Sequence, residues 1–232
     1  MTSPERVVVV GASGFGRECL DVLEAMAAAG SAVEVVGVVD DGPSEVNVER
    51  LAARGVPYLG TVEDWLATAE DSMWYVLAIG SPDIRRRLVG RLEDAGARPF
   101  TAVHPSATFG AQVVVGEGVV VCAGVAVSTN VRLGRHVHVN PNATIGHDAV
   151  VGDFVSVNPA AVVSGEVTIE DGTLIGASAT VLQQLSVGRG TIVGAGAVVT
   201  KAVPDGVVVK GIPGVWGDEH HKREEADHAA SG

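Results

Sequence analysis

The sequence of 232 residues is poor in cysteine, aromatic side chains and positive charge. Its two cysteines, Cys19 and Cys122, are too far apart for a disulfide framework or metal-type spacing, which fits a reducing compartment. Aromatic residues make up only 4%, so any core must consist mainly of aliphatic side chains. Sixteen Lys and Arg residues face 28 Asp and Glu residues, and the net charge of −12 argues against nucleic acid or an anionic membrane as a partner.

The sequence also lacks long apolar runs and a targeting signal. No stretch approaches the roughly 20 apolar residues of a membrane span. Residues 1–6 lead directly into four valines, without the apolar core and cleavage pattern of a signal peptide. We therefore expect a cytoplasmic protein with no membrane partner.

A six-residue repeat fills the second half of the sequence. Every sixth residue from Val103 to Val199 is aliphatic, with Phe109 as the single exception among seventeen positions. This period matches neither a helix nor an alternating strand. It is typical of a parallel β-helix, in which each turn buries the apolar face of its neighbour. At about 18 residues for each three-sided turn, the repeat predicts five to six turns without a large inserted loop.

The first hundred residues alternate between strand and helix patterns. Apolar runs at 7–10, 33–39 and 74–79 predict buried parallel strands. Segments 19–29 and 84–95 predict helices, and we expect the second to carry Arg85, Arg86 and Arg87 on its solvent side. This order is typical of a small doubly wound α/β domain. We therefore predict a Rossmann-like nucleotide-binding domain over 1–100, a β-helix over 101–214 and a disordered tail over 215–232.

A glycine-rich loop at residues 11–16 joins the first strand to the first helix. Such a loop lets backbone N–H groups at a helix start face a phosphate. Ser13 replaces the middle glycine of the dinucleotide fingerprint, which favours a nucleotide or nucleotide sugar over NAD(P). The glycines could instead serve only strand–helix packing. Asp40 and Asp41 close the second strand, where a nucleoside contact or a solvated turn is expected.

Polar residues that could perform chemistry gather in the middle turns of the predicted β-helix. His147 follows Ile145 and Gly146, so we expect it to point outward from a turn. Imidazole is the side chain best suited to accept a proton near neutral pH. His147 is therefore a candidate general base, with a surface histidine as the alternative. The other polar residues in these turns are His136, His138, Asn140, Asn142, Asp148, Asp153, Ser156 and Asn158.

Four segments together resemble one known family. They are residues 11–17 (GASGFGR), 78–85, 145–154 and 211–213. The chain resembles the sugar O-acyltransferase family of hexapeptide acetyltransferases, which includes sialic-acid O-acetyltransferases and N-acetyltransferases of nucleotide-linked 4-amino sugars. The resemblance implies left-handed β-helices and acetyl-CoA as co-substrate, bound in a groove between adjacent copies. Prisms of this kind commonly assemble as symmetric trimers, so we expect a homotrimer.

The resemblance also implies roles for individual residues. His147 would take a proton from a sugar amine or hydroxyl, tuned by Asp148, Asn140 or a water molecule. The amide of Gly165 would face the developing oxyanion. The nucleotide-linked sugar would contact Gly11, Ser13, Gly14, Phe15, Gly16, Arg17, Asp40, Asp41, Gly80 and Ser156.

Acetyl-CoA would follow the second half of the β-helix. Backbone near Gly165, Ala177 and Ala195 would contact the pantetheine arm. Lys201 and Lys210 are candidates for the CoA phosphates from their charge and position alone. We expect no metal.

Two positions depart from relatives that act on amino sugars. These relatives often carry an acidic residue at the position of Gly146 and can carry a second histidine at the position of Ser156. The choice between N- and O-acetylation is therefore open.

Three other interpretations are open. A zinc enzyme of the carbonic-anhydrase kind would need histidines five residues apart, whereas His136, His138 and His147 are two and nine residues apart. An acyltransferase could instead use a non-nucleotide acceptor, such as an amino acid or an antibiotic intermediate. The chain could also be a non-catalytic β-helix binding module.

Overall fold

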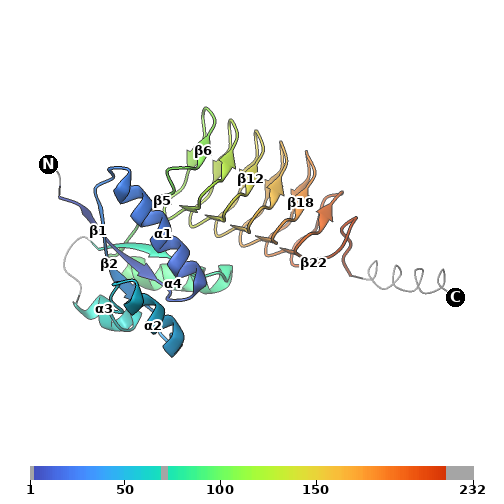
Figure 1. Cartoon of the computed structure of the whole chain (residues 1–232). Helices are drawn as coiled ribbons and strands as arrows, with labels where there is room; N and C mark the ends of the chain where they lie inside the picture. Colours follow the sequence, from blue (N-terminus) through green and yellow to red (C-terminus); the bar gives the residue numbers. More distant parts are fainter. Residues whose placement is uncertain (1–2, 69–72, 218–232) are drawn as a thin grey trace.

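The structure is a computed structural model that describes residues 3–68 and 73–217. An α/β domain comes first in the chain and a long β-helix follows it (Figure 1). The small parallel sheet and the parallel β-helix predicted from the sequence are both confirmed.

The N-terminal domain is a four-stranded parallel sheet with strand order β2-β1-β3-β4. The valine run in β1 is buried because the sheet is covered on both faces. Two of the helices, α2 and α3, were not predicted. The elements are β1 (Glu5–Val10), α1 (Gly14–Ala28), β2 (Val33–Val39), α2 (Glu45–Ala53), α3 (Val62–Thr68), β3 (Trp74–Leu77), α4 (Pro82–Asp94) and β4 (Arg98–Pro99).

The β-helix consists of 18 two-residue strands that form three parallel sheets, here called faces I, II and III. Each strand pairs with the strand 18 residues further on, as in Val139↔Val157, and only the last pairing in face I is shorter. The six turns confirm the predicted number.

The strands are distributed over the faces as follows. Face I contains β5 (Ala102–Val103), β8 (Val120–Val121), β11 (His138–Val139), β14 (Ser156–Val157), β17 (Leu174–Ile175), β20 (Ile192–Val193) and β22 (Val208–Val209). Face II contains β6 (Thr108–Phe109), β9 (Ala126–Val127), β12 (Thr144–Ile145), β15 (Val162–Val163), β18 (Thr180–Val181) and β21 (Val198–Val199). Face III contains β7 (Val114–Val115), β10 (Arg132–Leu133), β13 (Val150–Val151), β16 (Thr168–Ile169) and β19 (Ser186–Val187).

The six-residue period follows from this geometry. The three faces enclose a triangular prism. Apart from the exposed Phe109, the second residue of each strand points into this prism, and Val139, Ile145 and Val151 are at most 1% exposed. The first residue points outward, and a four-residue corner leads to the next face. Ten corner positions hold non-glycine residues in the left-handed region, including Asp148 at φ 59°. Asn and Asp tolerate this conformation best, which explains part of the polar character of the corners.

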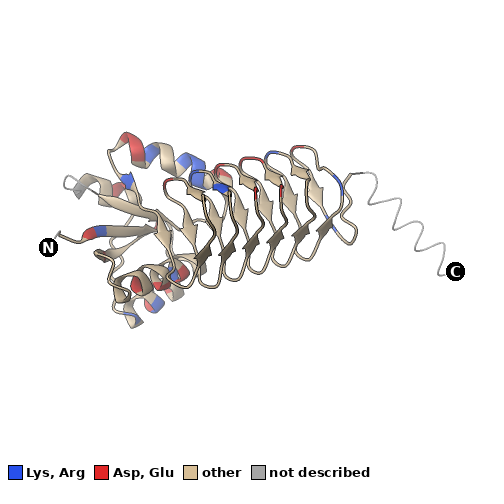
Figure 2. Cartoon of the chain, turned by 90° about the horizontal axis from the view of Figure 1, so that it is seen from above, with Lys and Arg blue, Asp and Glu red and all other residues tan. Residues whose placement is uncertain are grey.

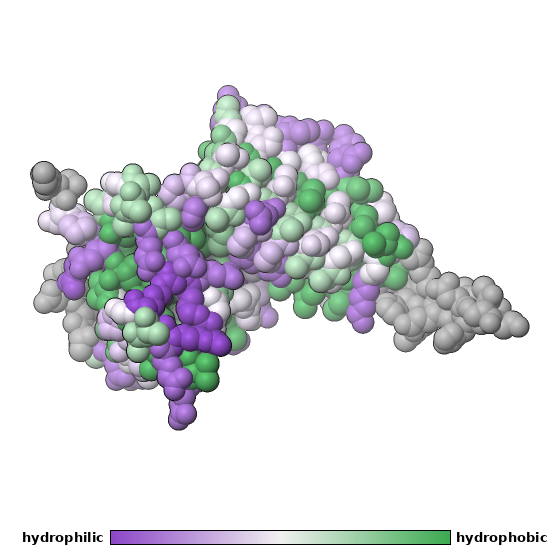
Figure 3. Space-filling model, viewed as in Figure 1, coloured by the Kyte–Doolittle hydropathy of each residue, from purple (hydrophilic) through white to green (hydrophobic). Residues whose placement is uncertain are grey.

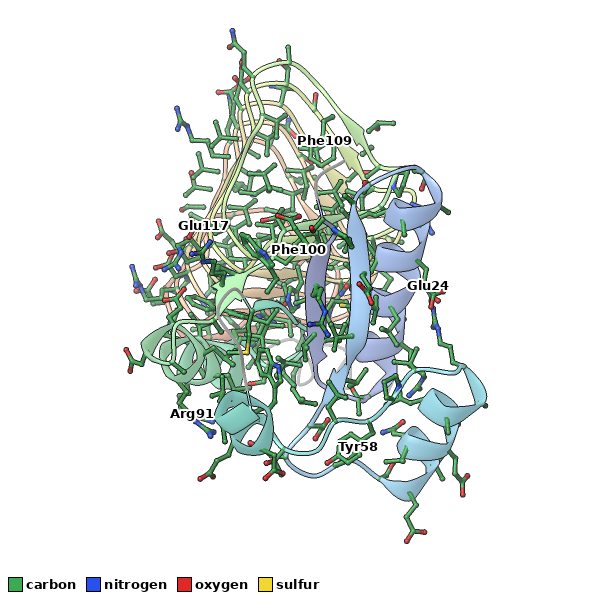
Figure 4. All side chains as sticks on the ribbon, turned by 90° about the vertical axis from the view of Figure 1, so that its left-hand side faces the viewer. Glu24, Tyr58, Arg91, Phe100, Phe109 and Glu117 are labelled. Carbon is green, nitrogen blue, oxygen red and sulfur yellow. The ribbon has the colours of Figure 1, made fainter. Side chains whose placement is uncertain are left out.

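The N-terminal domain packs against face I and the corner between faces III and I. Cys19 and Phe100 share one buried cluster with Val120 and Cys122 of the β-helix. The corner between faces II and III is therefore on the side of the prism away from this domain. Figure 4 shows this arrangement, with Phe109 near the far apex and Tyr58 at the opposite end.

Two expectations about exposure need correction. Arg86 and Arg87 are exposed, but Arg85 is completely buried because it lies on the same side of α4 as Val89 and Leu92. Val215, placed in the predicted tail, pairs with Lys210, and Trp216 packs against the β-helix core. The rest of the predicted tail, 218–232, lies outside the described residues.

Charged residues are mostly on the helices of the N-terminal domain, while the β-helix is largely uncharged (Figure 2). None of the described helices is both long enough and apolar enough to cross a membrane.

Candidate active site

His147 lies on the corner between faces II and III, immediately after β12. Its side chain is 56% exposed, and its Nδ1 lies 2.7 Å from Oδ2 of Asp148. The other carboxylate oxygen of Asp148 accepts a hydrogen bond of 2.9 Å from Nδ2 of Asn130, one turn earlier. The hydrogen bonds from His147 and Asn130 lower the pKa of Asp148. An ionised Asp148 fixes Nδ1 as the protonated nitrogen and leaves Nε2 free to act as a base.

The ring of His147 covers Gly165 on the next turn. A Cβ on Gly165 would lie 2.5 Å from Nε2 of His147, so only glycine leaves room for the ring in this position. Within the described residues the N–H of Gly165 has no acceptor, whereas its carbonyl accepts from Gln184. A free proton acceptor and a free backbone donor are thus adjacent on one corner.

The residues predicted to bind acetyl-CoA divide between two corners of the chain. Lys201 shares the corner of His147 and Gly165 and lies three turns from His147, roughly 14 Å along the axis. Its Nζ lies 4.8 Å from the centre of the Trp216 ring. The corner between faces I and II holds Ala177, Ala195 and Lys210 instead, so one chain does not bring all five residues together.

The glycine-rich loop, residues 11–16, forms a tight connection from β1 to α1. A Cβ on Gly11 would lie 2.7 Å from the carbonyl oxygen of Ala78, and one on Gly16 would collide with the carbonyl oxygen of Gly11. Ser13 precedes α1 but makes no side-chain cap, and no acidic residue occupies the first turn. The first N–H groups of α1 therefore remain available to an anion.

The two aspartates after β2 have structural partners, one in the glycine-rich loop and the other at the start of α3. Asp40 accepts from the N–H of Ala12 at 2.8 Å, and its carbonyl accepts from the Tyr58 hydroxyl at 2.9 Å. Asp41 caps α3 through the N–H of Val62 at 2.9 Å. Both carboxylates therefore have structural partners in addition to the predicted substrate role.

Arg17 is also held within the domain. Its Nη1 donates to the side chain of Asn47 at 2.8 Å and to the carbonyl of Ala12 at 3.2 Å. The loop, Arg17 and α2 therefore form one connected unit at the carboxyl ends of β1 and β2.

Ser156 and Gly80 are joined by Arg85, which is buried and not solvent-exposed as predicted. The Arg85 guanidinium donates to the carbonyl of Gly80 at 3.0 Å and to the hydroxyl of Ser156 at 3.0 Å. Ser156 is only 3% exposed. Its predicted contact with substrate stays a prediction, while its contact with Arg85 is direct.

The two other middle-turn histidines lie in the interface between the domains. His136 is stacked between Tyr75 and Phe154, and burial is the main cause that lowers its pKa to about 4. Burial also lowers the pKa of His138 well below its ordinary value. Neither ring is accessible, so neither can act as a general base for an external substrate.

Asn140 is separated from His147 in the chain. It lies at the start of the corner between faces I and II, where its Nδ2 donates to Asn158 at 3.0 Å. The residue that supports Asp148 is Asn130, which was not among the predicted site residues. Its position 18 residues before Asp148 would have placed it there.

The two halves of the candidate site lie on opposite sides of one chain. The glycine-rich loop lies against face I, where the centroid of the Phe15 ring is 4.7 Å from that of the His138 ring. His147 lies on the corner opposite face I, and Figure 1 shows the loops after β6, β12 and β18 on the side away from α2 to α4. No group of three His, Cys, Asp or Glu side chains in the described part of the chain could hold a metal ion.

Comparisons with protein families give two matches. Residues 6–92 match the family described as the PglD N-terminal domain. Residues 166–201 match the bacterial transferase hexapeptide (six repeats) family. The first match covers most of the N-terminal domain, and the second covers part of the β-helix.

Three relatives are similar in sequence or structure. The GDP-perosamine N-acetyltransferase of Escherichia coli O157:H7 is 33% identical over 150 residues, which span 64% of this chain and 65% of that protein, slightly less than two thirds of its length. PerB from Caulobacter crescentus, solved with CoA and GDP-perosamine, is 30% identical, with a TM-score of 0.82 over 91% of this chain and 96% of PerB. The acetyltransferase domain of PglB from Neisseria gonorrhoeae FA1090, solved with acetyl coenzyme A, is 31% identical, with a TM-score of 0.80 over 93% of this chain and 100% of that one.

Proposed function

The chain belongs to the PglD-type hexapeptide-repeat acetyltransferases, the family of perosamine-type and PglB-like nucleotide-sugar N-acetyltransferases, and on this premise we propose that it transfers the acetyl group of acetyl-CoA to the amino group of a nucleotide-linked sugar. The relatives that bind GDP-perosamine or acetyl coenzyme A favour this acceptor over a non-nucleotide one. They also favour N-acetylation, which the sequence left open.

The observation that supports the chemistry best is the arrangement of His147, Asp148 and Gly165. Asp148 accepts from Nδ1, so Nε2 is the basic nitrogen and points away from the prism core beside Gly165. The unpaired N–H of Gly165 is a donor that an oxyanion could use. A surface histidine with no function would need neither a glycine beneath its ring nor an aspartate on Nδ1.

The reaction can be written with these groups. The sugar nitrogen attacks the thioester carbonyl carbon while Nε2 of His147 takes a proton from that nitrogen. The negative charge that develops on the carbonyl oxygen is stabilised by the N–H of Gly165, typically by about 3 kcal/mol for one such donor. The C–S bond then breaks, the amide is released, and the proton on His147 can pass to the CoA sulfur.

The N-terminal domain would hold the nucleotide part of the substrate. The free N–H groups at the start of α1 suit a diphosphate. Asp40 and Asp41 lie at the end of β2, beside the same loop, where the ribose or base is expected in such folds.

A second copy of the chain completes the site in this proposal. The loop that would hold the nucleotide and the histidine that would accept the proton lie on opposite sides of one chain. The residues predicted for acetyl-CoA are likewise on two corners, which neighbouring prisms would bring together in a homotrimer. In Figure 3 hydrophilic residues line the upper edge of the β-helix, while much of its remaining visible surface is weakly polar or apolar. The exposed apolar residues of the β-helix include Val114, Val150, Ile192 and Val208. Such a surface suits contact between copies.

The proposal is tested by incubating the protein with acetyl-CoA and GDP-perosamine and measuring release of the free thiol of CoA. We expect turnover with the nucleotide-linked sugar and none with free amino acids. Turnover of amino acids without turnover of any nucleotide-linked amino sugar would replace the proposed acceptor. Acetyl-CoA, but not NAD, is expected to raise the melting temperature.

A further inference from the structure

Two loops at the edge of the N-terminal sheet contact neighbouring strands of face I. Phe15, in the glycine-rich loop, lies against His138 of β11. Gly80, after β3, is joined through Arg85 to Ser156 of β14. His138 and Ser156 are directly paired in the parallel ladder. Both loops that border the proposed phosphate site are therefore fixed on adjacent turns of the β-helix.

Arg85 provides the polar part of this contact. Its Nη1 donates to the carbonyls of Ile79 at 2.9 Å and Gly80 at 3.0 Å. Its Nη2 donates to the carbonyl of Phe154 at 2.6 Å and the hydroxyl of Ser156 at 3.0 Å. One guanidinium thus has two acceptors in each domain, and none of the four is a carboxylate.

The burial of the Arg85 charge restricts where its four hydrogen-bond acceptors can lie. Arg85 is completely buried, and burial lowers its pKa to about 10, so the guanidinium is still charged at neutral pH. A buried charge without a counter-ion is stable only where neutral acceptors surround it. The four acceptors must therefore keep their positions, and with them the Gly80 loop keeps its position on β14.

We infer that Arg85 is a positioning residue for the nucleotide-linked substrate, and that Ser156 is its partner on the β-helix; this inference rests on the proposed function. The nucleotide is bound by the N-terminal domain, while the amino group must reach His147 on another copy. Arg85 does not contact the reacting atoms. It fixes the domain that holds the nucleotide at the angle that brings the amine to the base.

The variant Ser156→Ala tests this inference because it removes one acceptor and leaves the bonds of Arg85 to Ile79 and Gly80 intact. With GDP-perosamine and acetyl-CoA we expect kcat to fall at least about tenfold, since small misplacements of a reacting group have large effects. The Kd for GDP and the KM for acetyl-CoA should stay within about twofold, because each nucleotide-binding surface is itself unchanged.

Two further variants separate positioning from other roles. Arg85→Lys keeps the charge but loses the planar fork, and we expect the same pattern of kinetic change. The double variant should be no worse than the poorer single variant, because Ser156 acts through Arg85. Ser186→Ala changes the equivalent outward position of β19, far from Arg85, and should leave kcat unchanged.

Three results would overturn the inference. A raised KM for GDP-perosamine with unchanged kcat would make Ser156 a direct substrate contact. Losses that multiply in the double variant would separate Ser156 from Arg85. A lower melting temperature with unchanged kcat per GDP-binding site would reduce the contact to a purely structural one.

Hydrogen exchange tests the placement independently of turnover. In Ser156→Ala, amides of residues 78–86 should exchange at least about tenfold faster than in the wild type. Unchanged exchange there contradicts the inference, whichever acceptor the enzyme uses. Absence of turnover in the wild type, with faster exchange in the variant, would refute the proposed acceptor and leave the role of Arg85 in fixing the Gly80 loop intact.

Discussion

The imidazole of His147 occupies the space where a side chain at Gly165 would begin. A Cβ on Gly165 would be 2.5 Å from Nε2 and 2.6 Å from Cε1 of the ring. The two residues are 18 positions apart, one turn of the β-helix, so the repeat itself places them in contact. This relationship joins the proposed base to the proposed oxyanion donor.

The substitution Gly165→Ala should displace the ring and reduce catalysis. We expect kcat to fall at least about tenfold, because a shift of the base by a fraction of an ångström already disturbs proton transfer. Gly90→Ala is the matched control, since Gly90 is exposed on α4 with nothing within 4 Å of an added Cβ. Equal kcat values for the two variants would separate the glycine from the chemistry.

Asn130 should support catalysis through Asp148. In Asn130→Ala, Asp148 loses a hydrogen bond to its charged form, so the pKa of Asp148 should rise toward its ordinary value. We expect kcat to fall about fivefold, the scale of losing one ordinary exposed hydrogen bond. Carboxylate NMR measures the pKa, and thiol release measures kcat.

Gln184→Ala provides the control for Asn130. Gln184 donates to the two carboxylate oxygens of Glu166, one turn away, at 3.4 Å and 3.3 Å. Both residues lie on the corner between faces II and III, at the positions equivalent to Asn130 and Asp148 on earlier turns. Gln184 lacks a contact with His147 among the described residues. A fall in kcat of equal size in both variants would show a general effect of the corner.

Acid should destabilise the protein partly through His136. Burial lowers the folded-state pKa of His136 from 6.5 to about 4, so the folded chain keeps this ring neutral while the unfolded chain protonates it. The stability that this difference provides is therefore fully present above pH 6.5 and is lost as the pH falls from 6.5 toward 4, by at most about 3 kcal/mol.

Urea denaturation at pH 7 and pH 5 measures this loss. His136→Asn, which keeps a residue suited to the left-handed backbone, should lose less stability between these values than the wild type. His104→Asn, which replaces a less buried histidine, should behave like the wild type. An identical pH dependence in all three proteins would show that His136 does not contribute to the loss of stability in acid.

Mixed assemblies should regain activity if the site is shared between copies. We expect His147→Ala and Gly16→Val to be inactive separately, the first without the base and the second without space for the glycine-rich loop. Co-expressed chains would form some sites with an intact loop from one copy and His147 from another. Thiol release by the mixture, but not by either variant alone, supports the shared site; its absence in a mixture of confirmed hetero-oligomers opposes it.

The sequence predicted the parts of the fold that repeat. A period of six placed Val139 and Ile145 inside the prism and His147 outside it, and 18 residues per turn placed Gly165 beside His147. The same spacing leads from Asp148 to Asn130, so that contact could have been predicted. The 18-residue spacing holds for the outward-facing corner residues as well as for the buried apolar ones.

The contacts between domains could not be predicted in the same way. An arginine in a helix rich in charged residues, such as α4, is normally solvated. The spacing of Arg85, Val89 and Leu92 nevertheless places all three on one helical face. What keeps the guanidinium buried is a set of acceptors about 70 residues away, at Phe154 and Ser156. No local pattern encodes such a contact.

The kcat of His147→Asn with acetyl-CoA and GDP-perosamine tests the central claim most directly. Asparagine retains polarity at this corner but cannot accept a proton near neutral pH. The proposed mechanism predicts a kcat at least about a hundredfold below that of the wild type, the usual scale for losing a general base, with an unchanged Kd for GDP. A kcat within about twofold of the wild-type value in a correctly folded protein would contradict the assignment of His147 as the general base.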